Sequence, residues 1–342
     1  MTLAIFALVV LLTSAFSFLN GFRDVSTSVA LAVRTRALTP SVAVLLAALF
    51  NLIGALFSAG LAVAISQNWV FLPPGNSGLT IIAAGLASAC AWGIFLWWRG
   101  VPSSSTHALV GGLAGAGTAS VLVGGNSVGG VDQSLLFQVA LPLVLSPAIA
   151  FIAAYLLVSP VTWAARYTQP SVVNKRFRAA QSVAAGAVAF GHGLQDGQRV
   201  SAVFILALLA AGYDDGGSLP LWVALVSAAT ITAGTLFGGW RISHTIGYRL
   251  TRIDPLRGVV AQGFSALLLF IGAIGLHWPV STTHTVTSAV LGAGENQQFA
   301  TIHRKLVTRI LSLWVLTPVT TAAGAFVLEL ALSPLINTTI AP

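Results

Sequence analysis

Charged side chains are scarce in this sequence. Asp, Glu, Lys and Arg make up 7% of its 342 residues, whereas hydrophobic residues make up 56%. A soluble domain carries roughly 25% charged residues, so this composition excludes an ordinary water-soluble fold. The chain instead contains about ten apolar stretches, each close to the roughly 20 residues that cross a bilayer as a helix. We therefore expect an all-α polytopic membrane protein that lies in a lipid bilayer.

Cysteine is nearly absent, because Cys90 is the single one in the chain. This excludes a disulfide framework. The six histidines do not share metal-ligand spacing with Cys or carboxylates, so we expect neither a metal site nor a cofactor. The net charge of +8 comes from basic residues spread between apolar stretches, a pattern that argues against nucleic acid as a partner. The first segment lacks the basic start of a signal peptide and is interpreted as a retained helix.

A polar stretch near the middle of the chain separates two groups of five apolar segments. We expect a first repeat over 1–165, a cytoplasmic linker over 166–178 and a second repeat over 179–342. The expected segments run over about 2–33, 41–66, 79–98, 104–124, 135–158, 179–211, 218–240, 259–276, 280–294 and 309–333. Whether 79–124 and 259–294 each form two spans or one re-entrant hairpin is not decided by the sequence.

Two motifs recur in the same order in the two halves, which is typical of an internal repeat. The run PSSSTH at 102–107 returns as PVSTTH at 279–284. A Phe, a Gly and an Asp that end at Asp24 return with the same spacing and end at Asp196. We interpret the chain as two repeats.

The basic residues between the apolar segments predict the orientation, since short cytoplasmic loops are enriched in Lys and Arg. The residues expected in the cytoplasm are Arg34, Arg36, the 166–178 linker with Lys175, the 241–257 loop with Arg252, Arg304 and Lys305. The loops at 67–78, 125–134 and 211–218 hold no Lys or Arg, and Asp132 and Asp214 are expected outside. This pattern predicts external termini and an odd number of crossings in each half, so that the repeats are inverted.

The two hydroxyl runs outline an anion site. A Pro precedes each run, and a segment rich in small residues follows it, so the hydroxyl groups are expected at the start of a new helix. Unpaired backbone N–H groups and the positive end of the helix dipole favour an anion there. The candidate ligands are Ser104, Ser105, Thr106, Ser281, Thr282 and Thr283. The alternative role for these residues is capping of a membrane helix without any ligand.

The histidines that end the two runs, His107 and His284, are interpreted as hydrogen-bonding or packing residues. A Ser/His hydrolase is a further alternative, but two equivalent runs suit a shared binding site better than one nucleophile with one base. We therefore do not expect an enzyme.

Two carboxylates lie inside apolar segments, Asp24 in the first half and Asp196 in the second. A carboxylate inside a membrane costs several kcal/mol unless it is paired or faces water, and such residues are usually functional. Arg23 is adjacent to the first, and Arg199 lies three residues after the second, on the same face of a continuous helix. The alternative is a neutral structural ion pair in each half.

The motifs together resemble those of the inorganic phosphate transporter (PiT) family, and the match covers nearly the whole chain. The matching motifs are NGFRDVST at 20–27, VPSSSTH at 101–107, HGLQDGQR at 192–199 and WPVSTTH at 278–284. The resemblance implies two inverted repeats with broken or re-entrant helices, alternating access, and coupling to sodium or protons. The family usually has Asn three residues after each Asp, where this chain has Thr27 and Arg199. Arg cannot coordinate a cation, so this difference argues against sodium.

We therefore expect a phosphate permease of the inner (plasma) membrane. The hydroxyl runs and Arg199 would bind the anion, while Asp24, Asp196, Thr27 and Arg23 would serve ion coupling. Coupling to protons is expected, with sodium as the alternative. A sulfate permease of the same family and a receptor or scaffold that no longer transports stay open as alternatives. The sequence does not decide whether copies of the chain assemble.

Overall fold

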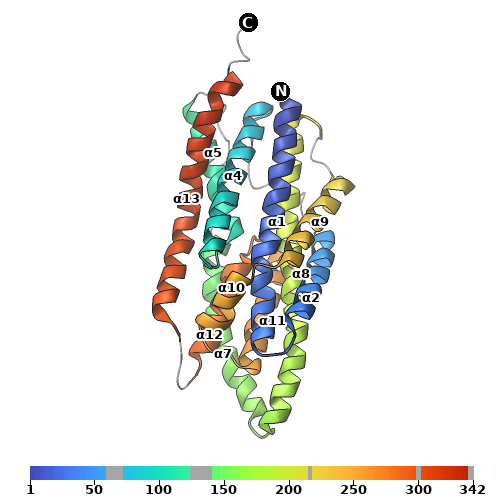
Figure 1. Ribbon diagram of the computed structural model, residues 1–342, viewed down its shortest axis with the longest axis vertical. Helices are drawn as coiled ribbons and strands as arrows, with labels where there is room; N and C mark the ends of the chain where they lie inside the picture. Colours follow the sequence, from blue (N-terminus) through green and yellow to red (C-terminus); the bar gives the residue numbers. More distant parts are fainter. Residues whose placement is uncertain (59–71, 124–140, 215–217, 298–301, 338–342) are drawn as a thin grey trace.

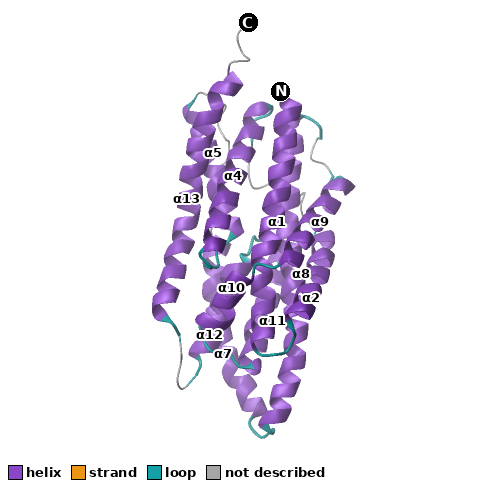
Figure 2. Ribbon diagram, in the orientation of Figure 1, coloured by secondary structure: helices purple, strands orange, loops and turns teal. Residues whose placement is uncertain are grey.

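The computed structural model describes residues 1–58, 72–123, 141–214, 218–297 and 302–337. Within these ranges every regular element is a helix (Figure 2). The first half contains α1 (Thr2–Arg34), α2 (Pro40–Phe57), α4 (Asn76–Trp98), α5 (Ser105–Leu122) and α7 (Leu141–Ala165). The second half contains α8 (Pro170–Ala211), α9 (Leu221–Phe237), α10 (Trp240–His244), η2 (Thr245–Arg249), α11 (Pro255–Phe270), η3 (Ile271–Gly275), α12 (Thr282–Glu295) and α13 (Arg304–Asn337).

The helices follow from long apolar runs and from proline at their starts. Pro40, Pro170 and Pro255 each open a helix at its first position, where the missing N–H is not needed. Among the described residues, seven helices are long and apolar enough to cross a membrane, or eight when the bent pair of α9 with α10 and η2 counts as one span. The protein is therefore an all-helical, multi-pass membrane protein, as expected.

The long helices of the two halves cross at matching glycines. A side chain at Gly21 of α1 would strike the backbone of Ile231 in α9, and a side chain at Gly193 of α8 would strike the backbone of Asn51 in α2. Only glycine allows so close an approach of two helix backbones. The helices α1 and α8 run in opposite directions (Figure 1). A close glycine contact of the same kind thus occurs in each half.

Two helical hairpins point toward each other at mid-height of the molecule. In Figure 1, α4 and α5 lie in the half that carries both termini, whereas α11 and α12 lie in the opposite half. The first turn is tied to α13, because the Trp314 Nε1–H donates to the Pro102 carbonyl at 2.9 Å. Because each hairpin turns back at mid-height instead of crossing to the far end, the structure favours re-entrant hairpins for 79–124 and 259–294.

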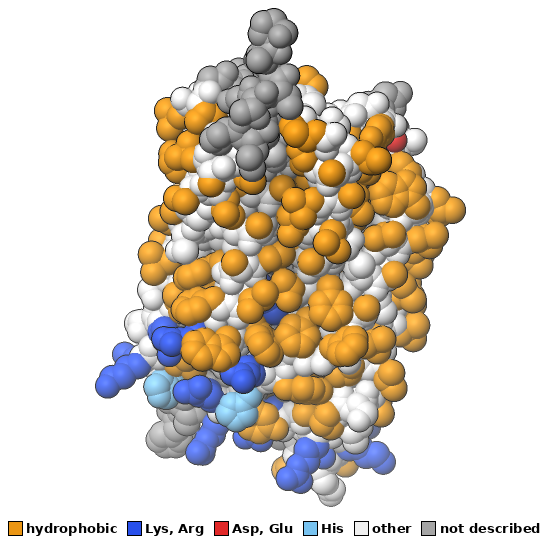
Figure 3. Space-filling view, turned by 45° about the horizontal axis from the view of Figure 1, so that its top comes forward, with side chains coloured by type: hydrophobic (Ala, Val, Ile, Leu, Met, Phe, Trp, Pro, Cys, Tyr) orange, Lys and Arg blue, Asp and Glu red, His pale blue; other side chains and the backbone are white. Residues whose placement is uncertain are grey.

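The connection between the halves is shorter than the expected linker. Residues 170–178 form the first turns of α8, because Pro170 starts that helix, and 166–169 alone join it to α7. The segments expected to be basic lie at the end opposite the termini (Figure 1). In Figure 3 the Lys and Arg side chains gather at that lower end, below a broad hydrophobic surface. The expected outside loop at 125–134, with Asp132, lies outside the described residues.

Candidate functional site

The hydroxyl runs start the two inner helices of the hairpins. Ser104 caps α5, and its side chain accepts a hydrogen bond from the His107 backbone N–H at 3.2 Å. Ser281 caps α12 in the same way through the His284 backbone N–H at 3.3 Å. Both serines therefore perform the capping role, and each hydroxyl proton stays available to donate.

Two threonines of these runs hold donors that no described residue accepts. Thr106 and Thr282 are buried, and neither hydroxyl has a hydrogen-bond partner within the described part of the chain. A buried hydroxyl without a partner costs free energy, so such groups indicate a missing ligand or water. Ser105, which lies between Ser104 and Thr106 in the sequence, is also buried.

The two helix starts lie against each other. The His107 and His284 rings are 4.6 Å apart between centroids, and the His284 ring stacks on Trp314 at 3.8 Å. The buried His107 Nδ1 and His284 Nε2 make no hydrogen bond to described residues. The structure thus brings together the two hydroxyl runs, which are far apart in the sequence, and their dipoles point at the same region.

Asp24 joins α1 to the start of α12. Its Oδ1 accepts a hydrogen bond from the Thr283 hydroxyl at 2.9 Å. Thr27, one turn later, donates its hydroxyl to the Asp24 backbone carbonyl at 2.6 Å instead of to the carboxylate. The Arg23 guanidinium points away from Asp24 and donates to Ser103, to Oγ at 2.7 Å and to the carbonyl at 3.1 Å. Arg23 therefore holds the turn between α4 and α5.

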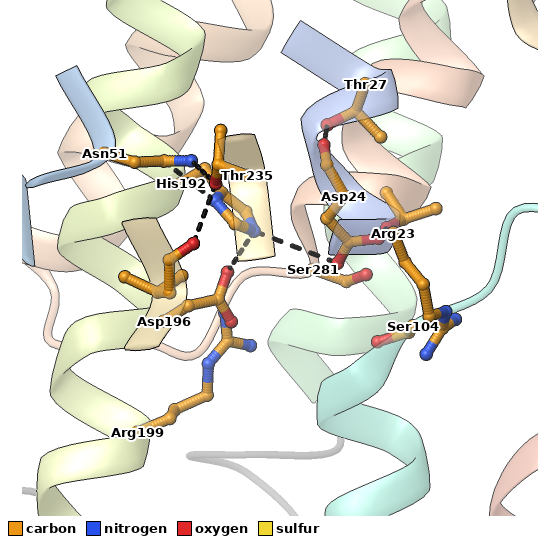
Figure 4. Close-up of polar contacts among 12 residues, drawn as sticks. Arg23, Asp24, Thr27, Asn51, Ser104, His192, Asp196, Arg199, Thr235 and Ser281 are labelled. Carbon is orange, nitrogen blue, oxygen red and sulfur yellow. Dashed lines mark hydrogen bonds and ion pairs between the residues drawn. The ribbon is translucent and has the colours of Figure 1, made fainter. Parts of the chain in front are cut away.

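Asp196 of α8 has two partners on its own helix (Figure 4). Arg199 forms a close ion pair with Asp196 Oδ1, and His192 Nε2 lies 2.9 Å from Asp196 Oδ2. The other His192 nitrogen, Nδ1, contacts Asn51 Oδ1 at 2.9 Å, and the Asn51 amide donates to the Thr235 hydroxyl at 2.8 Å. Asp196 is thus compensated by charge within α8, and its partner His192 is held by Asn51 of α2.

His192 also links the two carboxylates. Its Nε2 lies 3.9 Å from Asp24 Oδ2, so the ring stands between α1 and α8 (Figure 4). Arg199 keeps two donors, Nε and one terminal nitrogen, that are buried and without a partner among the described residues. The region therefore combines free hydroxyl and guanidinium donors with two carboxylates. Such a set binds an oxyanion by hydrogen bonds and can exchange a proton with it.

Comparison with known proteins identifies the family of this chain. The model of the phosphate transporter family matches residues 20–325. The chain belongs to the phosphate transporter family. A probable low-affinity inorganic phosphate transporter of Rhizobium meliloti is 41% identical over 303 residues, covering 88% of this chain and 89% of that protein. A protein of the same description from Bacillus subtilis is 34% identical, covering 93% and 94%. The suspected resemblance is confirmed.

A solved structure also matches this family member. It is described as "The sodium-dependent phosphate transporter", with a TM-score of 0.85, 21% identity, and coverage of 97% of this chain and 99% of that one. At this identity the likeness shows the fold alone. The expected all-α membrane fold is confirmed by it, and the family identity agrees with the expectation of a transporter rather than an enzyme.

Some site residues were not singled out from the sequence. His192 was considered only as a metal ligand, and Asn51 and Thr235 were not noticed because they lie in apolar segments without a repeated motif. One signal was present: His192 lies four residues before Asp196, on the same helix face. No group of three or more His, Cys, Asp and Glu side chains in the described ranges could hold a metal ion.

Proposed function

We propose that this family member is a phosphate permease of the inner membrane, built from two inverted repeats that move about one central anion site. The observation that carries the proposal is the set of unused donors at the paired helix starts. Thr106, Thr282 and Arg199 all present buried donor atoms without a partner among the described residues. A permanent cation and neutral hydroxyl groups together suit an anion that must also be released.

Each half contributes one wall of the proposed site. The first half would bind phosphate through Ser104, Ser105 and Thr106, and the second through Ser281, Thr282 and Thr283. Thr283 donates to Asp24, so binding of phosphate to this threonine would exchange Asp24 for the substrate. This exchange gives alternating access a physical step, because it breaks a contact between α1 and α12.

Asp24 favours phosphate over sulfate. Phosphate carries a proton at neutral pH and can donate to a carboxylate, whereas sulfate has none to donate. Asp196 is already occupied by Arg199 and His192, but Asp24 has one neutral hydrogen bond from Thr283. A carboxylate whose one hydrogen bond comes from a neutral hydroxyl would repel sulfate and accept the phosphate hydroxyl.

Coupling is proposed to use protons and not sodium, although the matched solved structure is named sodium-dependent. The Arg199 guanidinium pairs with Asp196, at the sequence position where the family usually has Asn. It supplies a fixed positive charge there. His192 lies between the two carboxylates and provides a route for a proton between them. Asp24, Asp196, Thr27 and Arg23 would tune this exchange.

Uptake of labelled phosphate and sulfate into proteoliposomes tests the proposal, with sodium and pH gradients applied separately. We expect phosphate uptake that responds to pH, continues without sodium and exceeds sulfate uptake. A strict sodium requirement would show that the coupling assignment is wrong. Absence of phosphate counterflow would favour the non-transporting receptor or scaffold.

The orientation is proposed from the basic end of the molecule, which would face the cytoplasm with both termini outside. Single cysteines in a Cys90→Ala background at positions 175, 252 and 214 can be labelled in intact cells with a reagent that does not cross the membrane. We expect labelling of position 214 alone. Labelling at 175 with protection at 214 would reverse the orientation.

A further inference from the structure

A hollow on the outer surface of the molecule lies beside the turn of the first hairpin. Its volume is about 410 Å³, and its walls come from the end of α4, from α10 and from η2. The side chains that define its chemistry are Trp98, Arg99, Trp240, Arg241, His244 and Arg249. None of these residues belongs to the proposed phosphate site.

The lining is strongly basic and contains no carboxylate. Arg249 makes no hydrogen bond or ion pair with any residue that the structure describes. Arg241 donates one N–H to the Trp98 carbonyl at 3.0 Å, which leaves its other donors available. Arg99 lies over the Phe95 and Trp98 rings and forms no ion pair within the described part of the chain. Three guanidinium groups without an acidic partner form a site for an anion.

The surroundings of the hollow are those of a membrane interface. Trp98 is 57% exposed and Trp240 is 42% exposed, beside other exposed apolar side chains of α4 and α9. In Figure 3 the basic side chains lie directly below the hydrophobic surface, at the end opposite the termini. Exposed Trp next to Arg is typical of the level of the lipid headgroups.

We propose that this hollow binds the phosphate of an anionic phospholipid headgroup from the leaflet at the basic end. The three Arg side chains would hold the phosphodiester and the glycerol headgroup, and the two Trp rings would lie against the start of the acyl chains. A lipid fits better than free phosphate, because the hollow opens on an apolar surface that acyl chains can cover and free phosphate cannot. Basic pockets between membrane helices bind such headgroups.

The bound lipid would also support the first hairpin. Arg241 donates to the Trp98 carbonyl, and the Thr245 hydroxyl donates to the Gly100 carbonyl at 2.7 Å. These carbonyls precede the hydroxyl run by only a few residues. A headgroup that holds Arg241 in place therefore stabilises the turn from which α5 starts.

The test compares lipid binding by purified, delipidated protein and by the double variant Arg99→Gln/Arg249→Gln. Neither side chain hydrogen-bonds to the described protein, so the fold is expected to persist, and thermal unfolding checks this. Arg309→Gln is the matched control, since Arg309 is an exposed arginine of α13 that does not line the hollow. Bound phosphatidylglycerol and phosphatidylcholine are measured by native mass spectrometry, with inorganic phosphate added as a competitor.

We expect the unmutated protein to prefer phosphatidylglycerol, and the double variant to bind it roughly 30-fold more weakly, about fivefold for each cation removed. The single variant Arg249→Gln should lose about fivefold, and Arg309→Gln should behave as the unmutated protein. Equal retention of phosphatidylglycerol by the double variant and the control would overturn the proposal. Displacement of the lipid by millimolar inorganic phosphate would also overturn it and assign the hollow to the free anion.

Discussion

The two aspartate centres occupy equivalent places in the two halves, but they are compensated in different ways. Asp196 is paired with His192 and Arg199 on its own helix. Asp24 has Thr27 and an Asn, Asn20, at the corresponding positions, and its carboxylate accepts from Thr283 of the opposite half. One centre is therefore satisfied within a single helix, whereas the other depends on a contact that rearrangement of the halves can break.

This difference assigns separate tasks to the two halves. A buried ion pair is strongly destabilised when one partner is removed, so under the proposed function the Asp196 centre suits a stationary role. A single neutral hydrogen bond is cheaper to exchange, so the Asp24 centre suits the step that changes during transport. His192 connects the two, which allows the charge of one centre to follow the state of the other.

The residue before each aspartate contacts a hairpin turn, through a charged group in one half and an amide in the other. Arg23 donates to Ser103 in the turn between α4 and α5. Gln195 donates to the carbonyls of Leu269 and Trp278, both at 3.3 Å, at the turn before α12. Each half thus holds its own hairpin turn from its long helix. The first half uses a charge for this purpose and the second half an amide.

The largest effect is expected from Asp196→Ala, because Arg199 then becomes a buried cation without its partner. Breaking such a pair costs about 3–5 kcal/mol, against about 1–3 kcal/mol for Asp24→Ala, which removes a hydrogen bond and leaves Arg23 on Ser103. Thermal unfolding in detergent measures both. The double variant Asp196→Ala/Arg199→Met should recover most of the stability without uptake. Equal losses for the two single variants would remove the distinction between the centres.

The next effect concerns the hairpin turns. Arg23→Met removes the two contacts that one charged nitrogen makes with Ser103, together worth about 1.5–3 kcal/mol, and should weaken phosphate affinity by misplacing the start of α5. Arg23→Lys should recover part of the phosphate affinity. Ser103→Ala keeps the contact with the carbonyl and should lower the affinity less. Uptake kinetics separate affinity from rate. If Arg23→Met lowers the rate and leaves affinity unchanged, Arg23 acts in coupling and not in positioning.

A smaller effect is expected at Thr106 and Thr283, two of the three threonines in the hydroxyl runs. Thr106→Val removes a donor that has no protein partner, so anion affinity should fall by about 1–2 kcal/mol without loss of stability. Thr283→Val should lower both anion affinity and stability, because the Thr283 hydroxyl also donates to Asp24. Thr13→Val is the control, since that hydroxyl donates to the Val9 carbonyl within α1. Unchanged uptake affinity in both test variants would show that the runs serve helix capping alone.

Local sequence signals were sufficient for the helices but not for the hairpins. The apolar segments predicted most helix ends to within a few residues, because bilayer crossing demands long apolar runs. The choice between spanning and re-entrant helices depends on packing against other elements, and 18 or 23 residues suit either arrangement. The helical start at Pro170 carried a readable signal, proline at the first helical position, that the linker interpretation passed over.

The site was predictable where contacts are local or repeated. The Arg199–Asp196 pair follows from spacing along one helix, and the hydroxyl runs follow from the repeat. The contact of His192 with Asn51 joins α8 to α2, and the Arg23 contact with Ser103 joins residues 80 apart. Both depend on how helices pack, which one sequence does not contain. Composition did indicate basic loops at one end, but not that three arginines share one hollow.

The smallest effect is expected from Thr27→Asn, which places the common family residue beside Asp24. The Thr27 hydroxyl bonds only to the carbonyl of its own helix, a contact that adds little to stability. Uptake should stay within about twofold of the unmutated protein and stay independent of sodium, because the Arg199 cation persists at the equivalent place in the other half. Uptake measured in sodium and in potassium media checks this. Arg199→Asn, by contrast, should strongly impair uptake, and the two variants together measure how unequal the halves are. If Thr27→Asn alone makes uptake depend on sodium, the first half binds the cation without help from the second. The Arg199 charge beside Asp196 then does not decide the coupling ion.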